Sequence, residues 1–375
     1  MKLSARADVA VVGAGIVGLG AAYAAVRRGL RVVVVDRTAS PVGSTVRNFG
    51  HLCIGMQTGQ ARRYGDIARE LWLRLARDAG FWLRESGTLV AAMRDDELAV
   101  LETAARGESP DVRMLDADEL RRRAPLRAGA VVGGALIAPD LQVNPREAAA
   151  AIIRHLAARG VEFHFRTAVT AIRPGGITTT RGTVDAGSVV VAVNHDIDQL
   201  LPGVAERADV QRCALDMMRV AGDLPAALEA PLLTGWSLVR YGRFSGLPET
   251  AALRDRLHAE RPDLAALDLN QMYTQLPDGS LILGDSHARA VQPGPFQPEG
   301  AFEAFLDQAL ALFDARRFRV IERWQGVYAS ARDEFLLEQP DDGVVVIAAT
   351  TGIGMTCGLG LAETALSTHL QEAPA

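Results

Sequence analysis

The sequence has few cysteines, and their spacing excludes several classes of protein. The three cysteines of the 375-residue chain stand at positions 53, 213 and 357 and form no Cys-x-x-Cys pair. This excludes a zinc ribbon and a disulfide scaffold, and it favours a reducing compartment. The seven histidines show no spacing typical of metal ligands. We therefore expect a cytoplasmic protein with no metal site.

The chain also lacks an excess of positive charge and a long apolar run. Its net charge of −5 excludes the basic face that nucleic-acid binding requires. No run of about 18 uncharged apolar residues is present, so no membrane span is expected. Lys2 and Arg6 precede an apolar stretch as in a secretory signal, but glycines in that stretch indicate another role. A hydrophobic content of 49% over this length predicts a large core and two domains.

The N-terminal segment contains a glycine motif typical of dinucleotide binding. The apolar run Val9–Val12 leads into Gly13-Ala14-Gly15-Ile16-Val17-Gly18, and an alanine-rich helix is expected next. Gly13 allows a tight turn, Gly15 lets the backbone approach a pyrophosphate, and Gly18 lets the helix pack closely on the strand. The helix N-terminus offers free N–H groups to the phosphates.

A second expected strand, Val32–Val35, ends at Asp36. An acid at this position can accept hydrogen bonds from a ribose hydroxyl. An ordinary turn between a strand and a helix is the alternative interpretation of the glycines. Because strand, glycines, helix and acid occur together, the segment predicts a bound dinucleotide.

Further expected elements alternate along the chain. Helices are expected at 67–79, 95–105, 116–124, 144–158 and 248–260, with a last helix that runs to Leu370. Strands are expected at 87–92, 133–137, 161–165, 167–173, 176–180, 188–193, 215–220, 232–240, 270–276, 281–286 and 343–349.

This order predicts an α/β fold with two discontinuous domains. Residues 1–83, 141–210 and 321–375 are expected to form a Rossmann-like dinucleotide-binding domain. Residues 84–140 and 211–320 form a substrate-binding domain with a mixed sheet.

The C-terminal region indicates which dinucleotide is bound. The strand expected at 343–349 leads into Gly352-Ile353-Gly354-Met355-Thr356, a second junction between a strand and a helix. Its helix N-terminus would stabilise the negative charge of a reduced flavin. A structural turn that closes the sheet is the alternative. Together with the N-terminal motif, the junction favours FAD over NAD.

With the loop Ser44-Thr45-Val46-Arg47-Asn48, these motifs resemble the D-amino-acid oxidase, glycine oxidase and sarcosine oxidase superfamily of FAD enzymes (the DAO family) over nearly the whole chain. Four segments resemble more narrowly a branch associated with phosphonate catabolism, which is linked to oxidation of 2-aminoethylphosphonate and its N-methyl or 1-hydroxy relatives. These segments are 44–50 (STVRNFG), 211–219 with Met217-Met218, Gly284-Asp285-Ser286-His287, and 322–330 (ERWQGVYAS).

The resemblance implies an FAD-binding domain of the glutathione reductase type, and it implies where each part of FAD is bound. Ser44 and Thr45 would contact the pyrophosphate, and Val169 would pair with the adenine through its backbone. Residues 352–356 would supply N–H groups to the isoalloxazine. The full predicted set is Gly13, Gly15, Ile16, Val17, Gly18, Asp36, Arg37, Ser44, Thr45, Arg47, Asn48, Gly50, Val169, Gly352, Ile353, Gly354, Met355 and Thr356.

The sequence departs from its relatives at three positions that bear on chemistry. Tyr328 follows Trp324-Gln325-Gly326-Val327 where amino-acid oxidases carry the arginine that holds a carboxylate, and tyrosine cannot replace that charge. Gly326 matches the cysteine that attaches flavin in sarcosine oxidases, so non-covalent FAD is expected. Ile282 stands in place of a lysine linked to oxygen activation, which leaves open oxygen or another electron acceptor.

The anion of the substrate therefore needs other donors. A phosphonate has three oxygens and suits several separate donors, whereas a carboxylate favours one planar fork. The pair Arg240-Tyr241 is expected to follow a strand of the substrate domain, although a lone arginine can also be a solvated surface charge. The predicted substrate-binding residues are Arg47, His51, Arg240, Tyr241, His287 and Tyr328, with Arg243 and Arg323 as further candidates.

These observations predict an FAD-dependent amine oxidoreductase that deaminates a small aminophosphonate by hydride transfer to flavin N5, with no catalytic base assigned. Its expected partners are an anionic amine and an electron acceptor. Three alternatives stay open: an oxidase of a D-amino acid, glycine or sarcosine; a dehydrogenase with an acceptor other than oxygen; and a flavoprotein that binds FAD for structure or sensing.

Overall fold

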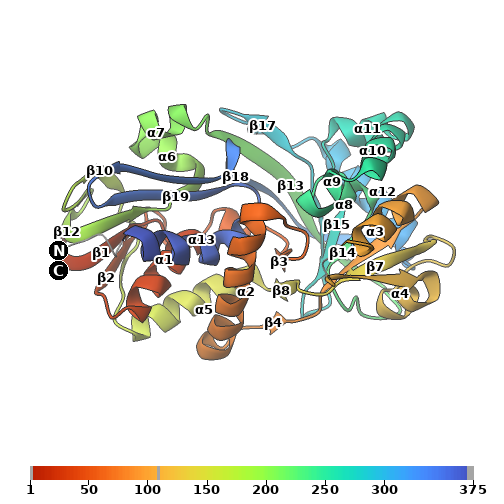
Figure 1. The fold of residues 1–375 in the computed structure, drawn as a ribbon, viewed down its shortest axis with the longest axis horizontal. Helices are drawn as coiled ribbons and strands as arrows, with labels where there is room; N and C mark the ends of the chain where they lie inside the picture. The colour runs from red at the N-terminus through yellow and green to blue at the C-terminus, as the bar shows by residue number, and fades with distance from the viewer. Residues whose placement is uncertain (1–2, 108–109, 370–375) are drawn as a thin grey trace.

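One mixed sheet runs through the whole molecule (Figure 1). A computed structural model describes residues 3–107 and 110–369. The strands lie in the order β6-β7-β5-β14-β15-β16-β13-β18-β19-β12-β1-β2-β9. The long strand β18 (Phe318–Asp341) joins the two ends, because it pairs with β13 (Gln211–Gly222) and with β19 (Val344–Thr351). The α/β fold expected from the sequence is confirmed.

The end of the molecule that contains the chain's N-terminal strand is a parallel sheet packed against helices. Strand β1 (Leu3–Val12) pairs in parallel with both β2 (Val32–Val35) and β12 (Gly182–Val191). Helices cover one face of this sheet (Figure 1), and an antiparallel pair of strands lies toward the other. The helices are α1 (Ile16–Arg27), α2 (Gly59–Ala79), α5 (Pro145–Ala158) and α13 (Gly354–His369), and the antiparallel pair is β10 (Val169–Arg173) and β11 (Gly176–Thr179). Strand β9 (Glu162–His164) extends the parallel sheet beside β2.

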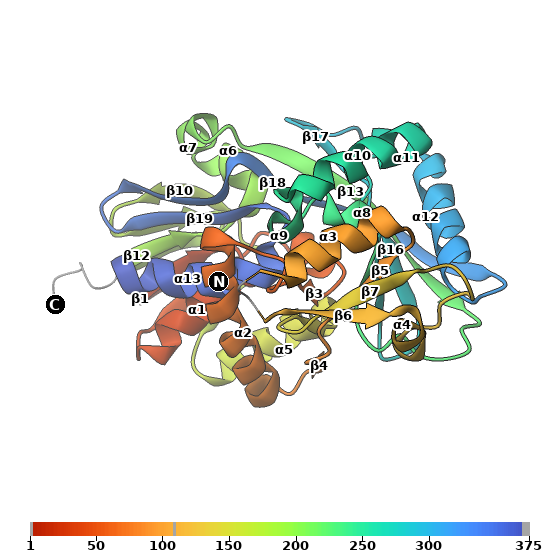
Figure 2. The same cartoon turned by 45° about the vertical axis from the view of Figure 1, so that its right-hand side comes forward.

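The other end has a more antiparallel sheet with its own apolar core, and Figure 2 shows its helices from the side. Its strands are β5 (Thr88–Ala92), β6 (Val112–Asp116), β7 (Gly133–Ile137), β14 (Leu232–Leu233), β15 (Met272–Gln275), β16 (Leu281–Gly284) and β17 (Ala288–Ala290). Its helices are α3 (Asp95–Ala105), α4 (Ala117–Arg123), α8 (Gly235–Leu238), α9 (Gly242–Ser245), α10 (Pro248–Glu260), α11 (Pro262–Ala266) and α12 (Glu299–Leu312).

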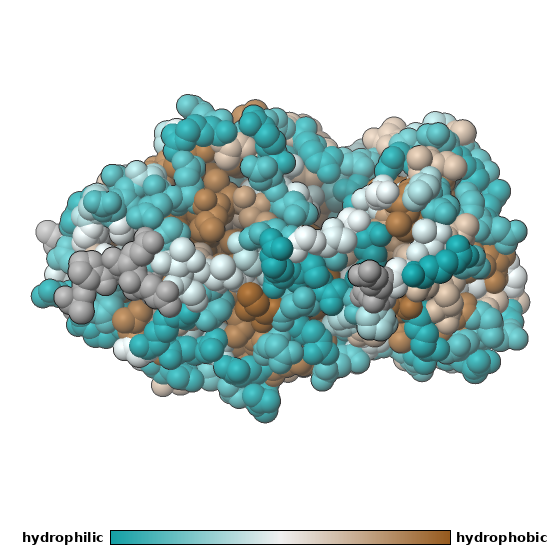
Figure 3. All heavy atoms as spheres, viewed as in Figure 1, coloured by the Kyte–Doolittle hydropathy of each residue, from teal (hydrophilic) through white to brown (hydrophobic). Residues whose placement is uncertain are grey.

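Short elements complete the fold between these two ends. They are the 3-10 turns Ser44–Val46 and Asn194–Asp196, the helices α6 (Ile197–Leu200) and α7 (Pro202–Arg207), and a small sheet of β3 (His51–Leu52), β4 (Leu83–Arg84) and β8 (Leu141–Val143). The face in Figure 3 is mostly hydrophilic and narrows between the two ends. Among the described helices, none is long and apolar enough to cross a membrane.

The elements with clear end signals form as expected. The helices predicted at 95–105 and 248–260 are α3 and α10, and the Asn144 side chain accepts the Arg146 N–H (3.3 Å) at the start of α5. Helix α2 begins at Gly59, eight residues before the predicted start. Leu370, the predicted end of the last helix, lies outside the described residues.

The strand predicted at 232–240 is wrong over most of its length. Only Leu232–Leu233 pair as a strand, and α8 follows at Gly235. The segment is buried almost throughout, and a short buried apolar run has no period that separates a strand from a helix. Arg240 and Tyr241 therefore follow a short helix rather than a strand.

Candidate active site

The glycine motif has the geometry that a tight turn and close packing of the following helix require. Gly13 has φ +103°, and a Cβ there would lie 2.5 Å from the Ala192 carbonyl oxygen. A Cβ at Gly18 would lie 2.0 Å from the Gly13 carbonyl oxygen, well inside contact distance. The tight turn and the close approach of α1 to the sheet therefore both exclude a side chain.

Side chains from two other segments hold this turn in place. The Ala14 N–H donates to Asp36 Oδ2 (2.8 Å), and the Ile16 N–H donates to Thr45 Oγ1 (2.8 Å). Asn194 Nδ2 donates to Ser44 Oγ (2.9 Å). The first turn of α1 and the 3-10 turn after β2 thus form one polar cradle.

Three adjoining cavities begin at this cradle and share lining residues. The glycine-motif cavity (about 520 Å³) lies between β1, β2 and β10, and the middle cavity (about 100 Å³) lies under β18 and the start of α13. The large cavity (about 790 Å³) opens toward the other end of the molecule. Ser44 and Thr45 line the first two, and Tyr328 and Gly352 line the last two.

Most residues predicted to bind the cofactor line these cavities. The glycine-motif cavity contains Asp36, Arg37 and Val169, and the middle cavity contains Ile16 and Val17. Gly18 and Gly50 line none of the three cavities, and each packs closely against the backbone of another residue. The lining set among the predicted residues is Gly13, Gly15, Ile16, Val17, Asp36, Arg37, Ser44, Thr45, Arg47, Asn48, Val169, Gly352, Ile353, Gly354, Met355 and Thr356.

Hydrogen bonds from the first half of the chain position the C-terminal junction. Trp72 Nε1 donates to the Met355 carbonyl oxygen (3.0 Å), and the Cys53 N–H donates to Thr356 Oγ1 (3.1 Å). The Cys53 thiol lies in the wall of the large cavity, where burial raises its pKa to about 12. It is therefore a protonated thiol near neutral pH.

Arg47 was predicted to contact both cofactor and substrate. It lines the middle and glycine-motif cavities but not the large one, and its Nη1 donates to the Gln325 carbonyl oxygen (3.1 Å). A Cβ on the neighbouring Gly326 would lie 2.8 Å from the Arg47 carbonyl oxygen. The backbone at Gly326 thus leaves little room for any side chain.

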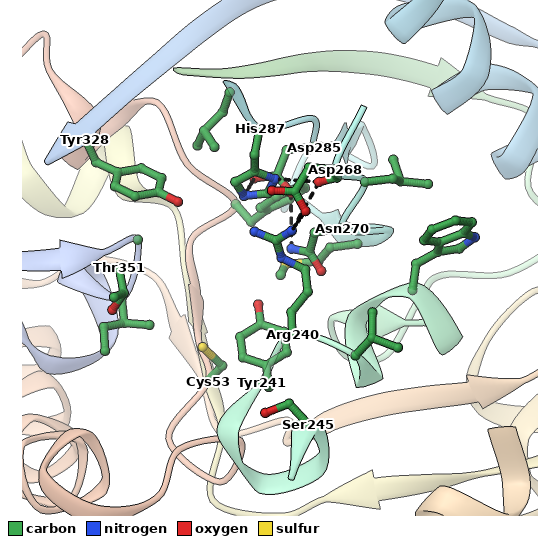
Figure 4. A pocket seen from close by; sticks show the side chains of 18 of the residues that line it. Cys53, Arg240, Tyr241, Ser245, Asp268, Asn270, Asp285, His287, Tyr328 and Thr351 are labelled. Atoms are coloured by element: carbon green, nitrogen blue, oxygen red, sulfur yellow. Dashed lines mark hydrogen bonds and ion pairs between the residues drawn. The ribbon is translucent and has the colours of Figure 1, made fainter. Parts of the chain in front are cut away.

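The large cavity has a charged wall at the side away from the glycine motif (Figure 4). Arg240 Nη1 donates to the Asp268 carbonyl oxygen (3.1 Å) and pairs with its Oδ1 (2.5 Å). Arg289 Nη1 pairs with Asp268 Oδ2 (2.7 Å). Arg240 Nε and Nη2 have no hydrogen-bond partner in the described part of the chain, so they are free to bind a ligand.

His287 and Asp285 flank the Arg240 guanidinium. His287 Nδ1 lies 3.0 Å from the Asp268 carbonyl oxygen and therefore carries a hydrogen, so the lone pair of the neutral ring is on Nε2. Nε2 lies 3.6 Å from Asp285 Oδ2. Burial and the nearby Arg240 lower the pKa of His287 to about 3, which keeps the ring neutral at physiological pH.

Burial raises the pKa of both acids of this wall, but their net pKa shifts are opposite. It raises the pKa of Asp285 to about 7, although Arg240 and a hydrogen bond from Asn270 act against the increase. For Asp268, burial is outweighed by Arg240 and Arg289, which hold its pKa below the ordinary value. Asp268 is thus a fixed anion, whereas Asp285 can gain or lose a proton near pH 7.

The remaining predicted substrate residues also line the large cavity. Tyr241 and Tyr328 are buried, which raises the pKa of each hydroxyl. Figure 4 shows the Tyr328 hydroxyl directed toward the charged wall. His51 is almost fully buried, with Nε2 2.6 Å from Thr88 Oγ1 and 3.4 Å from Asp140 Oδ2.

Four other residues singled out in the sequence lie elsewhere or in the wall. Arg243 pairs with Asp111 (2.8 Å) and Arg323 with Glu299 (2.7 Å), and neither lines any of the three cavities described above. Met217 is part of the large cavity's wall. Ile282 is buried in β16 and lines none of the three cavities.

Sequence reasoning missed Asp268, Asn270, Asp285 and Arg289. Asp285 stood inside a quoted motif, and its buried neighbours were the signal that could have marked it. Asp268 follows α11 and Arg289 lies in the short strand β17, and neither stands in a motif that marks a site. In the described residues, no group of three or more His, Cys, Asp or Glu side chains could hold a metal ion.

A Rossmann-like cradle that continues through a narrow cavity into a large polar cavity is typical of a dinucleotide-binding redox protein. The sequence from 8 to 367 matches the family described as FAD dependent oxidoreductase (DAO), and the chain belongs to this family. It binds FAD, and its residues fit that cofactor, since Gly13 and Gly15 line a cavity at the N-terminus of α1 and the three cavities follow one another from Asp36 to Tyr328.

Sequence matches to individual proteins cover less of the chain than the match to the family does. Monomeric sarcosine oxidase from Bacillus sp. (strain B-0618) is 29% identical over 210 residues, which are 53% of this chain and 54% of that protein. Gamma-glutamylputrescine oxidoreductase from Escherichia coli (strain K12) is 28% identical over 231 residues, 55% of this chain and 53% of that protein. The chain thus spans about half the length of the curated relatives it matches.

Solved structures share the whole fold. Glycine oxidase from Geobacillus kaustophilus has a TM-score of 0.78 at 20% identity, with 99% of this chain and 96% of that chain covered. FAD-bound L-alpha-glycerophosphate oxidase from Mycoplasma pneumoniae has a TM-score of 0.72 at 16% identity, with 97% and 94% covered. At these identities the likeness supports the fold alone.

Proposed function

We propose that the protein is an FAD-dependent amine oxidoreductase that oxidises a small aminophosphonate to an aldehyde. The observation that carries the proposal is the free Nε and Nη2 of Arg240 in a cavity that adjoins the cofactor groove. Relatives named for sarcosine and gamma-glutamylputrescine support the amine as the group oxidised.

The donors around Arg240 favour a tetrahedral anion. The Arg240 guanidinium and the Tyr241 hydroxyl line the large cavity from the loop between α8 and α9, and the Tyr328 hydroxyl lines it from β18. Tyr328 stands where amino-acid-oxidising relatives carry the arginine of a planar fork. Separate donors suit the three oxygens of a phosphonate better than the two oxygens of a carboxylate.

The cofactor and the protein have separate tasks in this proposal. FAD, when bound, accepts the hydride from the carbon next to the amine. The residues of the large cavity bind the anion, orient the amine toward the middle cavity and exclude water. Water then hydrolyses the imine product. Because Gly326 and its surroundings offer no attachment point, FAD would be held without a covalent bond at that position.

The proposal assigns the two ends of the molecule to two domains. Residues 1–83, 141–210 and 321–375 would bind FAD, and residues 84–140 and 211–320 would bind substrate. In support, the buried apolar residues near the glycine motif and those near the charged wall form separate clusters. The three buried, unpaired cysteines support a reducing compartment such as the cytoplasm.

Anaerobic reduction of the bound flavin by a panel of amines tests the function. The panel contains 2-aminoethylphosphonate, its N-methyl and 1-hydroxy forms, glycine and sarcosine. Two matched controls keep the spacing and change the anion: 3-aminopropanoate is a planar carboxylate and 2-aminoethanesulfonate is a tetrahedral monoanion. We expect bleaching by an aminophosphonate at the lowest concentration. Reduction by glycine, sarcosine or 3-aminopropanoate but not by the phosphonates would replace the proposal with an amino-acid oxidase.

The electron acceptor is tested on the same reduced enzyme. Ile282 provides no charge to any of the cavities, which favours a dehydrogenase over an oxidase. Slow reoxidation in air together with fast reoxidation by a quinone would support a dehydrogenase, and fast reoxidation in air would support an oxidase. A flavin that no amine reduces would favour a structural or sensing role.

A further inference from the structure

A second side chain of the charged wall is suited to the amine end of the substrate. Asp285 lies at the end of β16 and lines the large cavity beside Arg240. Asn270 Nδ2 donates to its Oδ1 (3.1 Å), and two backbone hydrogen bonds between the same residues fix the loop (2.7 and 2.9 Å). The carboxyl group is therefore buried and held in one orientation, with Oδ2 left toward His287.

An amine substrate must lose a proton before it can be oxidised. In water an alkylammonium such as a lysine side chain loses its proton near pH ~10.4. Hydride transfer requires the neutral amine, because its lone pair stabilises the iminium that forms. A site that binds the ammonium at neutral pH must therefore supply a group that takes the proton.

We propose that Asp285 is this group: its carboxylate accepts the proton of the bound substrate ammonium before the hydride leaves. The inference rests on the proposed amine oxidation. In the step, one N–H bond of R–NH₃⁺ breaks and one O–H bond forms at Asp285 Oδ2, which leaves R–NH₂ and the neutral acid. No electrons are transferred, and no further reactant is needed.

The neighbours of Asp285 stabilise both its carboxylate and its protonated form. Arg240 stabilises the carboxylate that receives the proton. The Nε2 lone pair of neutral His287 faces Oδ2 at 3.6 Å and can accept a hydrogen bond from the acid that results. Burial places the pKa of Asp285 near 7, where a base is both available and effective at physiological pH.

The other acids near the cavity are less suited. Asp268 is occupied by Arg240 and Arg289 and is held as a permanent anion. Glu334 also lines the cavity, but it is exposed to solvent at its rim. The titratable and charged groups that face Asp285 from its own loop and from the packed elements are Arg240, Tyr241, Asp268, His287, Cys213 and Tyr328.

The pH dependence of flavin reduction tests the role of Asp285. The rate constant at subsaturating substrate is measured anaerobically between pH 5 and 10. For the wild type we expect a rise that levels off near pH ~7. In Asp285→Asn we expect a rate about 100-fold lower at pH 7 that keeps rising toward the pKa of the free amine. Asp285→Glu retains an acid and should restore the plateau.

A matched control separates proton transfer from folding. Asp216 is a second buried acid, bonded to Ser286 Oγ (3.1 Å) and Gln297 Nε2 (2.9 Å), and it lines none of the three cavities. Asp216→Asn should keep the wild-type plateau, and every variant is compared at equal FAD content.

The outcomes distinguish this inference from the proposed function. If Asp285→Asn keeps the plateau of the wild type, Asp285 is not the proton acceptor, whatever the change in rate. The same conclusion follows if the wild type itself has no plateau near pH 7. If no amine reduces the wild-type flavin, the proposed function fails first.

Discussion

Replacing Arg240 by methionine removes the guanidinium from the charged wall while keeping most of its length. The substrate anion would lose up to two hydrogen bonds, from Nε and Nη2. A hydrogen bond to a charged group contributes about 1.5–3 kcal/mol, so the loss amounts to roughly 3–6 kcal/mol. Since each 1.4 kcal/mol changes an equilibrium constant about tenfold, the substrate Kd should rise by about 10²–10⁴.

The structure indicates that this variant remains folded. Asp268 keeps Arg289 as a partner at Oδ2 (2.7 Å), and its carbonyl oxygen keeps His287 Nδ1 (3.0 Å). No buried carboxylate is left without a partner, which limits the loss of stability. Arg240→Met should therefore contain as much FAD as the wild type.

Anaerobic stopped-flow reduction at a series of substrate concentrations gives the Kd and the limiting rate separately. Arg323→Met is the matched control, because Arg323 pairs with Glu299 on the surface and lines no cavity. A rise in Kd of less than tenfold in a fully flavinated Arg240→Met protein would refute the assignment of Arg240 to the anion. A fall in limiting rate with unchanged Kd would do the same.

The other predictions concern the cofactor cradle and the stability of the charged wall. Gly18→Ala places a Cβ 2.0 Å from the Gly13 carbonyl oxygen, so it should destabilise the fold by about 1–3 kcal/mol and cause loss of bound FAD. The flavin-to-protein absorbance ratio and the Tm measure these two effects. The control is Gly300→Ala on α12, whose added Cβ meets no atom within 4 Å and should change neither quantity. Asp285 has a raised pKa in the folded state, so it stabilises the protein at acid pH, and this contribution is lost as pH rises from about 4 to about 7. The free energy of unfolding of Asp285→Asn, measured in urea, should thus increase relative to that of the wild type by up to about 4 kcal/mol as pH rises from 4 to 8. A difference between the two proteins that does not change with pH would contradict this. His287 has a lowered pKa in the folded state, so its contribution to stability is lost as pH falls below 6.5. The free energy of unfolding should therefore fall less between pH 7 and pH 4 in His287→Gln than in the wild type.

The sequence by itself determined the fold class and the cofactor region. Gly18 is required by contact with the Gly13 backbone in the same βα unit, and Gly13 by its positive φ in the turn, so the spacing of the motif can be read locally. The same holds for α3, α5 and α10, whose ends are marked by acids, asparagine or proline at the first turn. Local steric and capping requirements leave a local pattern, and for that reason these predictions succeeded.

Only the tertiary structure decided the composition of the charged wall. Arg240 follows α8, Asp268 precedes β15, Asp285 follows β16 and Tyr328 lies in β18, so four separate segments meet there. Their proximity results from the pairing of β13 with β16 and β18, and no period in the sequence encodes it. Neighbouring charges then shift the pKa values of the two buried acids in opposite directions, because two arginines outweigh burial at Asp268 while burial prevails at Asp285. An aspartate becomes an anion anchor or a proton acceptor through its neighbours, and these are known only once the chain is folded.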